Sequence, residues 1–153
     1  MAKRRETKKQ RPTKPGLQPG HRAKSEGKTL RSYGVGALPM INHILRRMRL
    51  PEILRKGLPA DDPRVELPTY RGLSVLVRNV LISREPIYGV GQWATRYAPG
   101  LLGLRQQDIT RLNDDRIGRC LDRLFDGLDN GLIMAVVRQV IDEFKISLDE
   151  LHN

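Results

Sequence analysis

Acidic side chains are the first candidates for chemistry in this chain, because several carboxylates together can hold the divalent ions used in phosphoryl transfer. The sequence contains three adjacent acidic pairs, Asp61–Asp62, Asp114–Asp115 and Asp149–Glu150. The first pair is typical of a turn, and the second complements the positive end of a helix dipole. The third lies at the chain end. The pattern predicts no metal site, and we expect no catalytic residue and no cofactor.

The other residue types that commonly do catalysis are scattered. The three histidines, His21, His43 and His152, lie far apart, and Cys120 is the single cysteine. A lone cysteine without a closely spaced histidine predicts neither a zinc site nor an internal disulfide, and it fits a reducing cytoplasm. The two Gly-Val-Gly triplets lack the third glycine of a dinucleotide-binding loop. These residues therefore favour binding over catalysis.

One row of basic side chains could bind nucleic acid. Arg116, Arg119 and Arg123 have i, i+3 and i+7 spacing, which places them along one face of a helix. Guanidinium groups match phosphate oxygens and guanine edges, so we predict that this row contacts DNA. The alternative is an ordinary solvated face on which Arg119 pairs with Asp115 and Arg123 pairs with Asp122 or Asp126.

The charge of the chain is concentrated in its first segment. Residues 1–31 contain eleven Lys or Arg and two Glu, a net charge of +9, whereas residues 32–153 contain seventeen basic and fifteen acidic residues, a net charge of +2. A flexible cationic arm gains free energy by releasing counterions from a phosphate backbone, although such an arm can also serve solubility alone. The predicted DNA-binding residues of this arm are Lys3, Arg4, Arg5, Lys8, Lys9, Arg11 and Lys14.

The elements that would carry these residues are helices. Residues 1–31 are rich in proline, glycine and charge, so we expect a disordered basic tail. Apolar residues then recur at helical spacing, and all-α is the expected fold class: a single domain of about five helices. The run at 73–83 could also be a buried strand by composition, but its spacing favours a helix. The expected helical segments are 38–50, 51–56, 86–98, 114–126 and 132–144, with a loop at 58–68. A further helix is expected to follow Thr69 and to carry Leu73, Leu76, Val77, Val80 and Leu81.

Local signals predict where several helices begin and end. Thr69 and Asn113 are expected N-caps, and Gly127 is expected to take a left-handed conformation after the last turn of its helix. The side chains expected to face the core from the last two helices are Ile117, Cys120, Leu121, Leu124, Phe125, Ala135, Val136, Val140 and Phe144.

The order of three segments resembles a known family. YGVGALPMINHILRRMRLPEILRKGLP, LSVLVRNVLISREPIYGVGQWA and above all LNDDRIGRCLDRLF are similar to the N-terminal domain of insertion-sequence transposases of the DDE superfamily. The resemblance covers residues 33–148 and leaves the basic tail out. It implies a helical domain that precedes an RNase-H-like catalytic domain, with residues 149–153 as the start of the link between them. It also implies that none of the three catalytic acids lies in this chain, Asp149 included.

The expected function is DNA binding without catalysis by a cytoplasmic protein, and the expected partners are DNA and either a second copy or a full-length transposase. No apolar stretch is long enough to predict a membrane helix. The alternative function is an interaction module, in which the helices of Trp93 and Phe125 pair with another chain. A third interpretation, an RNA-associated basic protein, has less support because the folded part lacks an exposed aromatic signature.

Overall fold

The computed structural model describes residues 31–128 and 131–147, so the predicted tail residues 1–30 and the terminal residues 148–153 lie outside the described part. Within that part the all-α prediction is confirmed, because the chain forms helices and no strand, with one isolated bridge between Gly34 and Tyr97. The helices are α1 (Leu38–Arg47), α2 (Leu50–Gly57), α3 (Thr69–Ile82), η1 (Ile87–Gly89), α4 (Val90–Ala94), η2 (Pro99–Leu102), η3 (Gln106–Arg111), α5 (Asp114–Leu128) and α6 (Leu132–Phe144), where η marks a 3-10 helix.

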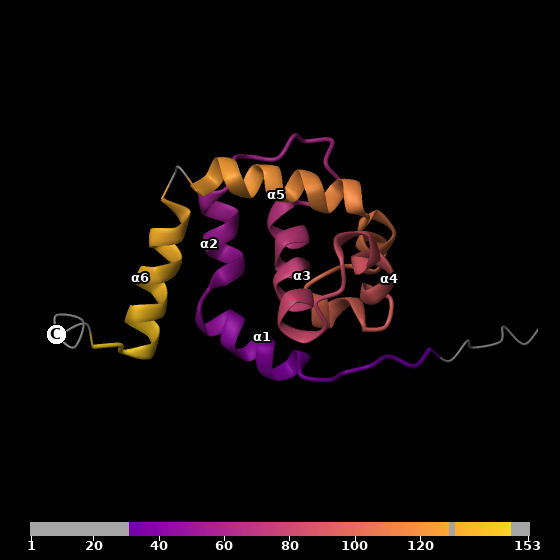
Figure 1. The fold of residues 1–153 in the computed structure, drawn as a ribbon, viewed down its shortest axis with the longest axis horizontal. Coiled ribbons are helices and arrows are strands. Elements are labelled where there is room, and N and C mark those ends of the chain that lie inside the picture. The colour runs from indigo at the N-terminus through magenta and orange to yellow at the C-terminus, as the bar shows by residue number, and fades with distance from the viewer. Residues whose placement is uncertain (1–30, 129–130, 148–153) are drawn as a thin grey trace, which may run out of the picture. The chain divides into compact units, whose positions relative to one another are not determined.

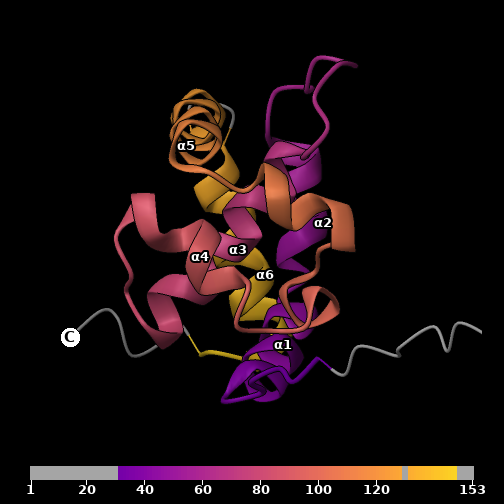
Figure 2. The same cartoon turned by 90° about the vertical axis from the view of Figure 1, so that its right-hand side faces the viewer.

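Helix α3 is the centre of this domain. In Figure 1, α2 lies on one side of α3 and α4 on the other, α5 crosses α3, and α6 lies on the outer side of α2. Figure 2 gives the same order, with α4 in front and α6 at the back. None of the helices in the described part is both long and apolar enough to cross a lipid bilayer.

Two groups of buried apolar side chains meet along α3. Val75 packs with Trp93 in one group, whereas Leu73 packs with Cys120 in the other. The helices α3 and α5 approach closely at Gly72, where an added β-carbon would lie 2.6 Å from the Cys120 Sγ atom. The Trp93 indole donates a hydrogen bond to the Ser83 hydroxyl (2.8 Å), so this fully buried ring satisfies its one polar group.

The expected helix over 86–98 is wrong in its extent. The segment forms η1, the five-residue helix α4, and then an irregular turn. After Ala94 the backbone N–H groups of Thr95, Arg96 and Tyr97 donate to carbonyl oxygens three residues earlier instead of four. Gly34 then donates its backbone N–H to the Arg96 carbonyl oxygen (2.8 Å). Two further 3-10 helices, η2 and η3, lie between this segment and α5, where no helix was expected.

Of the three predicted helix-end residues, one is confirmed and two are wrong. Asn113 is confirmed, because its side-chain oxygen accepts the backbone N–H of Arg116 (2.8 Å) at the start of α5. Thr69 is not an N-cap but the first residue of α3. Gly127 is a buried helical residue whose small size lets α5 approach Leu58, and the left-handed conformation belongs to Gly131 (φ 76°).

The predicted inward faces of the last two helices are correct only in part. Ile117 and Cys120 are buried, but Phe125 is 71% exposed. On α6, Ala135 is exposed and Phe144 remains 38% exposed beneath the guanidinium of Arg47. The physical reason is that α6 packs mainly against α2 and α5, so several apolar side chains on its other side stay exposed.

Burial of Cys120 leads to a prediction about its reactivity. The thiol is fully buried between α3 and α5, and this desolvation raises its pKa. Because exposure of the thiol requires opening of the core, we expect labelling by Ellman's reagent at pH 8 to be roughly 1,000-fold slower in the native protein than in guanidinium chloride. Equal rates in the two conditions would show that α5 does not cover this side chain.

Candidate nucleic-acid interface

The carboxylate of Asp61 fastens the loop between α2 and α3 to the start of α3. Asp61 accepts the backbone N–H of Thr69 (2.8 Å) and also the Thr69 hydroxyl, so a residue from the loop caps α3. This long-range cap explains why Thr69 does not need to cap the helix itself. Thr69 is 1% exposed, and its polar groups therefore depend on Asp61 for hydrogen bonding.

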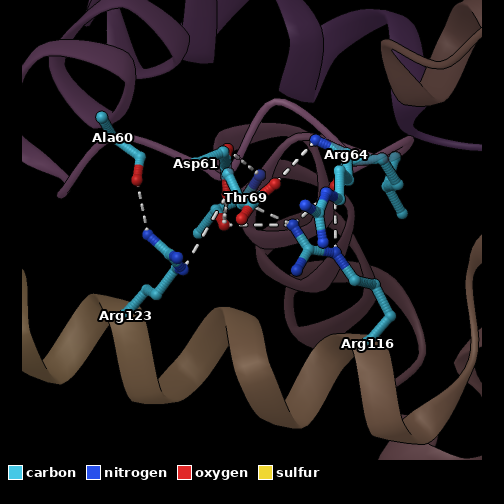
Figure 3. A network of polar contacts seen from close by, with 8 residues as sticks. Ala60, Asp61, Arg64, Thr69, Arg116 and Arg123 are labelled. Atoms are coloured by element: carbon cyan, nitrogen blue, oxygen red, sulfur yellow. Dashed lines mark hydrogen bonds and ion pairs between the residues drawn. The ribbon is translucent and has the colours of Figure 1, made fainter.

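Two of the three arginines predicted to face DNA instead point at this loop (Figure 3). The Arg116 guanidinium donates to the Leu67 carbonyl oxygen (2.6 and 2.9 Å) and lies 3.4 Å from Asp61, with only 13% of its side chain exposed. Arg123 donates to the Ala60 carbonyl oxygen (2.8 Å) and lies 4.0 Å from Asp61. Both side chains join α5 to the loop, which leaves them few donors for a ligand.

Arg119 lies between these two residues in sequence and is the most exposed of the three. Its side chain is 65% exposed and forms an ion pair with Asp115, one turn earlier on α5. The alternative given by the sequence, pairing of Arg119 with Asp115 on a solvated face, is confirmed. Arg123 lies near the loop residue Asp61 (4.0 Å), and its expected pairing with Asp122 or Asp126 stays a prediction.

A surface hollow of ≈ 620 Å³ lies between this loop, η3 and the start of α5. Its lining combines four arginines with three carboxylates: Arg64, Arg111, Arg116, Arg119, Asp62, Glu66 and Asp115. Arg111 is held by Glu66 (2.8 Å), and this hydrogen bond lowers the pKa of the Glu66 carboxyl. Arg64 is exposed, and no hydrogen bond or ion pair to its guanidinium occurs among residues 31–128 and 131–147.

Arg64 and Arg111 were missed by the sequence analysis. They lie in a loop and in a 3-10 helix, and neither element gives a periodic signal that would join them to α5. Their proximity to Arg119 depends on how the loop folds back onto α5. In the described part of the chain, no three His, Cys, Asp or Glu side chains gather closely enough to hold a metal ion.

The remaining predicted residues fall into two groups. Lys3, Arg4, Arg5, Lys8, Lys9, Arg11 and Lys14 lie outside the described residues, so their contact with DNA stays a prediction. Trp93, whose helix was expected to pair with another chain in the alternative function, is fully buried and belongs to the core. Phe125, the other aromatic residue of that alternative, is exposed.

These features define a small all-α domain whose surface carries paired arginines around a shallow hollow. The chain belongs to the family described as a domain of unknown function, DUF4277, which matches residues 30–145. No curated protein and no solved structure gives a significant match. The description of the family assigns no activity, so the resemblance to transposases stays a prediction.

Proposed function

We propose that this protein binds duplex DNA without cutting it, as the N-terminal helical part of an insertion-sequence transposase. The observation that carries the proposal is the distribution of charge: a net +9 within residues 1–31 against +2 in the remaining 122 residues. Concentrated cationic charge favours phosphate binding through counterion release, and this effect requires no particular base sequence. The resemblance of residues 33–148 to transposases supports DNA as the polyanion and a cytoplasmic location.

In this proposal the folded domain adds a second, weaker contact at the hollow beside α5. Arg64 has no partner for its guanidinium within the described residues, and it lies on the same hollow as Arg119. The ion pair of Arg119 with Asp115 is exposed on both sides, and such pairs contribute only about 0.2–1 kcal/mol. A phosphate can therefore replace Asp115 as the partner of Arg119 at little cost. Arg116 and Arg123 act as positioning residues that hold the loop carrying Arg64.

The test is a salt titration of binding to a short DNA duplex. We expect the logarithm of the binding constant to fall linearly with the logarithm of salt concentration. Replacing the seven basic tail residues Lys3 to Lys14 with glutamine should make that slope shallower by roughly six, because each neutralised phosphate contributes about 0.9. Absence of binding at low salt, or an unchanged slope in the glutamine variant, would contradict the proposal.

Single substitutions on the folded domain distinguish a contact at the hollow from the general effect of removing one positive charge. Arg119→Gln should reduce the slope by about one. The matched control is Arg96→Gln, because the Arg96 side chain is about as exposed as that of Arg119 (59% against 65%) and also forms an ion pair, with Glu85 (3.3 Å), but does not line the hollow. Equal effects of both substitutions would show that the hollow is not a contact. Competition between duplex DNA and a structured RNA of equal length distinguishes the RNA-binding alternative.

A second candidate function is association with another protein chain, either a second copy or a full-length transposase. It is favoured by the exposed apolar side chains of α6 and by Phe125, which have no covering element in the described residues. Exposed apolar surface of this kind is typical of interaction sites. Association with another chain and DNA binding use different partners, so one protein can have both functions.

A further inference from the structure

Helix α6 is apolar on both sides, although only one side is covered. Leu132 and Val136 face α2 and the end of α5. A surface helix ordinarily has one apolar stripe and a polar opposite face. The outward side of α6 and the residue pair that follows it instead expose large apolar groups: Ile133 (55%), Met134 (69%), Val137 (42%), Phe144 (38%) and Ile146 (46%).

The outward side also carries one pair of opposite charges in a defined order. Arg138 and Asp142 lie four residues apart, beside Met134, Val137 and Ile141, where they line a shallow hollow of ≈ 560 Å³. Both charged residues are exposed, and no ion pair to either occurs among the described residues. A charged pair along the edge of an apolar stripe resembles the flanking positions that select a partner helix in coiled coils.

We propose that α6 is the contact surface for a second copy of this chain, with the two α6 helices antiparallel across a twofold axis near Val140. This axis brings the same edge of the helix together in both copies, so Arg138 of each copy faces Asp142 of the other. The two salt bridges form only in this antiparallel arrangement, because a parallel twofold pair places the charged edges on opposite sides. The charge order of α6 is thus complementary to itself.

The apolar residues fit the same axis. Val137 and Ile141 lie three residues before and one residue after the centre, so the four side chains from two copies alternate along the contact. Met134 lies one turn before Arg138 in the same row of the helix, so it extends the contact beyond the charged pair at each end of the dimer. The contact would cover the side chains that the monomer leaves exposed, and this burial supplies the driving force.

The size of the surface sets the expected affinity. A helix of 13 residues is roughly 20 Å long, and one pair of such helices buries an area at the lower end of specific interfaces. We therefore expect a dissociation constant on the order of 10 µM, a dimer that forms and separates readily. The arrangement is independent of the proposed DNA binding, because it involves no residue of the hollow beside α5.

Sedimentation equilibrium of the full chain without DNA, at concentrations from 1 to 200 µM, tests the proposal. We expect a monomer–dimer equilibrium that Met134→Asp weakens at least tenfold. The matched control is Met40→Asp: each methionine is the third residue of its helix, and their exposed fractions are 69% and 66%. Met40→Asp should leave dimerisation unchanged. A strict monomer at 200 µM, or equal weakening by both variants, would overturn the proposal.

A charge-swap experiment tests the antiparallel geometry itself. Arg138→Asp and Asp142→Arg each place like charges opposite each other twice in the dimer, so each should weaken dimerisation at least tenfold. The double variant R138D/D142R restores opposite charges across the axis and should recover the affinity of the unmodified chain. An additive loss in the double variant would show that α6 binds something other than an antiparallel second copy. Because these measurements contain no DNA, their failure leaves the proposed DNA binding standing.

Discussion

Gly91→Ala is expected to destabilise the folded protein by about 3 kcal/mol, because the added methyl group has no space. A β-carbon at Gly91 would lie 2.2 Å from the backbone carbonyl oxygen of Leu112 and 3.4 Å from its carbonyl carbon. The obstacle is backbone rather than a flexible side chain, so α4 must move away from the residues that lead into α5. Urea unfolding followed by circular dichroism gives the free energy of unfolding for comparison.

The control for this prediction is another helical glycine. Gly118 lies within α5, and an added β-carbon would meet nothing within 4 Å. Because glycine costs a helix interior about 0.5–1 kcal/mol relative to alanine, Gly118→Ala should stabilise the protein by that amount. The two substitutions are chemically identical, so an equal effect of both would mean that α4 does not pack against Leu112.

Asp61→Ala is expected to cost about 2–4 kcal/mol, since one side chain holds the loop, the start of α3 and α5 together. Removing the carboxylate leaves the buried N–H and hydroxyl of Thr69 without their acceptor. It also removes the opposite charge beside Arg116, whose side chain is only 13% exposed. The Arg116 guanidinium would keep its hydrogen bonds to the Leu67 carbonyl oxygen, but a largely buried charge without a nearby opposite charge and buried donors without an acceptor are both costly.

Asp62→Ala is the matched control, because it removes the neighbouring carboxylate of the same loop. Asp62 is exposed, and within the described residues it accepts one hydrogen bond, from the backbone N–H of Arg64 (2.8 Å). We expect the free energy of unfolding to change by less than about 1 kcal/mol, as for most exposed substitutions. A larger loss from Asp62→Ala than from Asp61→Ala would contradict the role of Asp61 as the centre of this network.

A second hydrogen-bond network, centred on Arg78, also depends on residues that are far apart in the sequence. Arg78 is buried on α3, where its guanidinium donates to the Asn42 side-chain oxygen (2.8 Å) and to the Ser74 carbonyl oxygen (2.7 Å). Asn42 in turn donates to the Leu101 carbonyl oxygen (2.8 Å), so α1, α3 and η2 are joined. Burial lowers the pKa of Arg78 from its ordinary value. Nothing in the local sequence around Arg78 distinguishes it from an exposed helical arginine.

The positions of the longer helices could be predicted because their signals are local. The apolar spacing of α1, α3 and α5 and the cap Asn113 each act within a few residues. The segment after Pro86 was mispredicted because apolar spacing does not distinguish one continuous helix from the short pieces η1 and α4 followed by a turn with i→i−3 hydrogen bonds. Phe125 was mispredicted because helical spacing cannot say whether a neighbouring helix covers the whole apolar stripe.

By itself, the sequence determined the fold class, the extent of most helices and the separation of a basic arm from a nearly neutral domain, because composition and periodicity are properties of the chain. Tertiary structure decided what the arginines of α5 do. Arg116 and Arg123 meet Asp61 across more than fifty residues, and only the folded arrangement brings these groups together. Ion pairing depends on distance and desolvation in space, and spacing along one helix specifies neither of them.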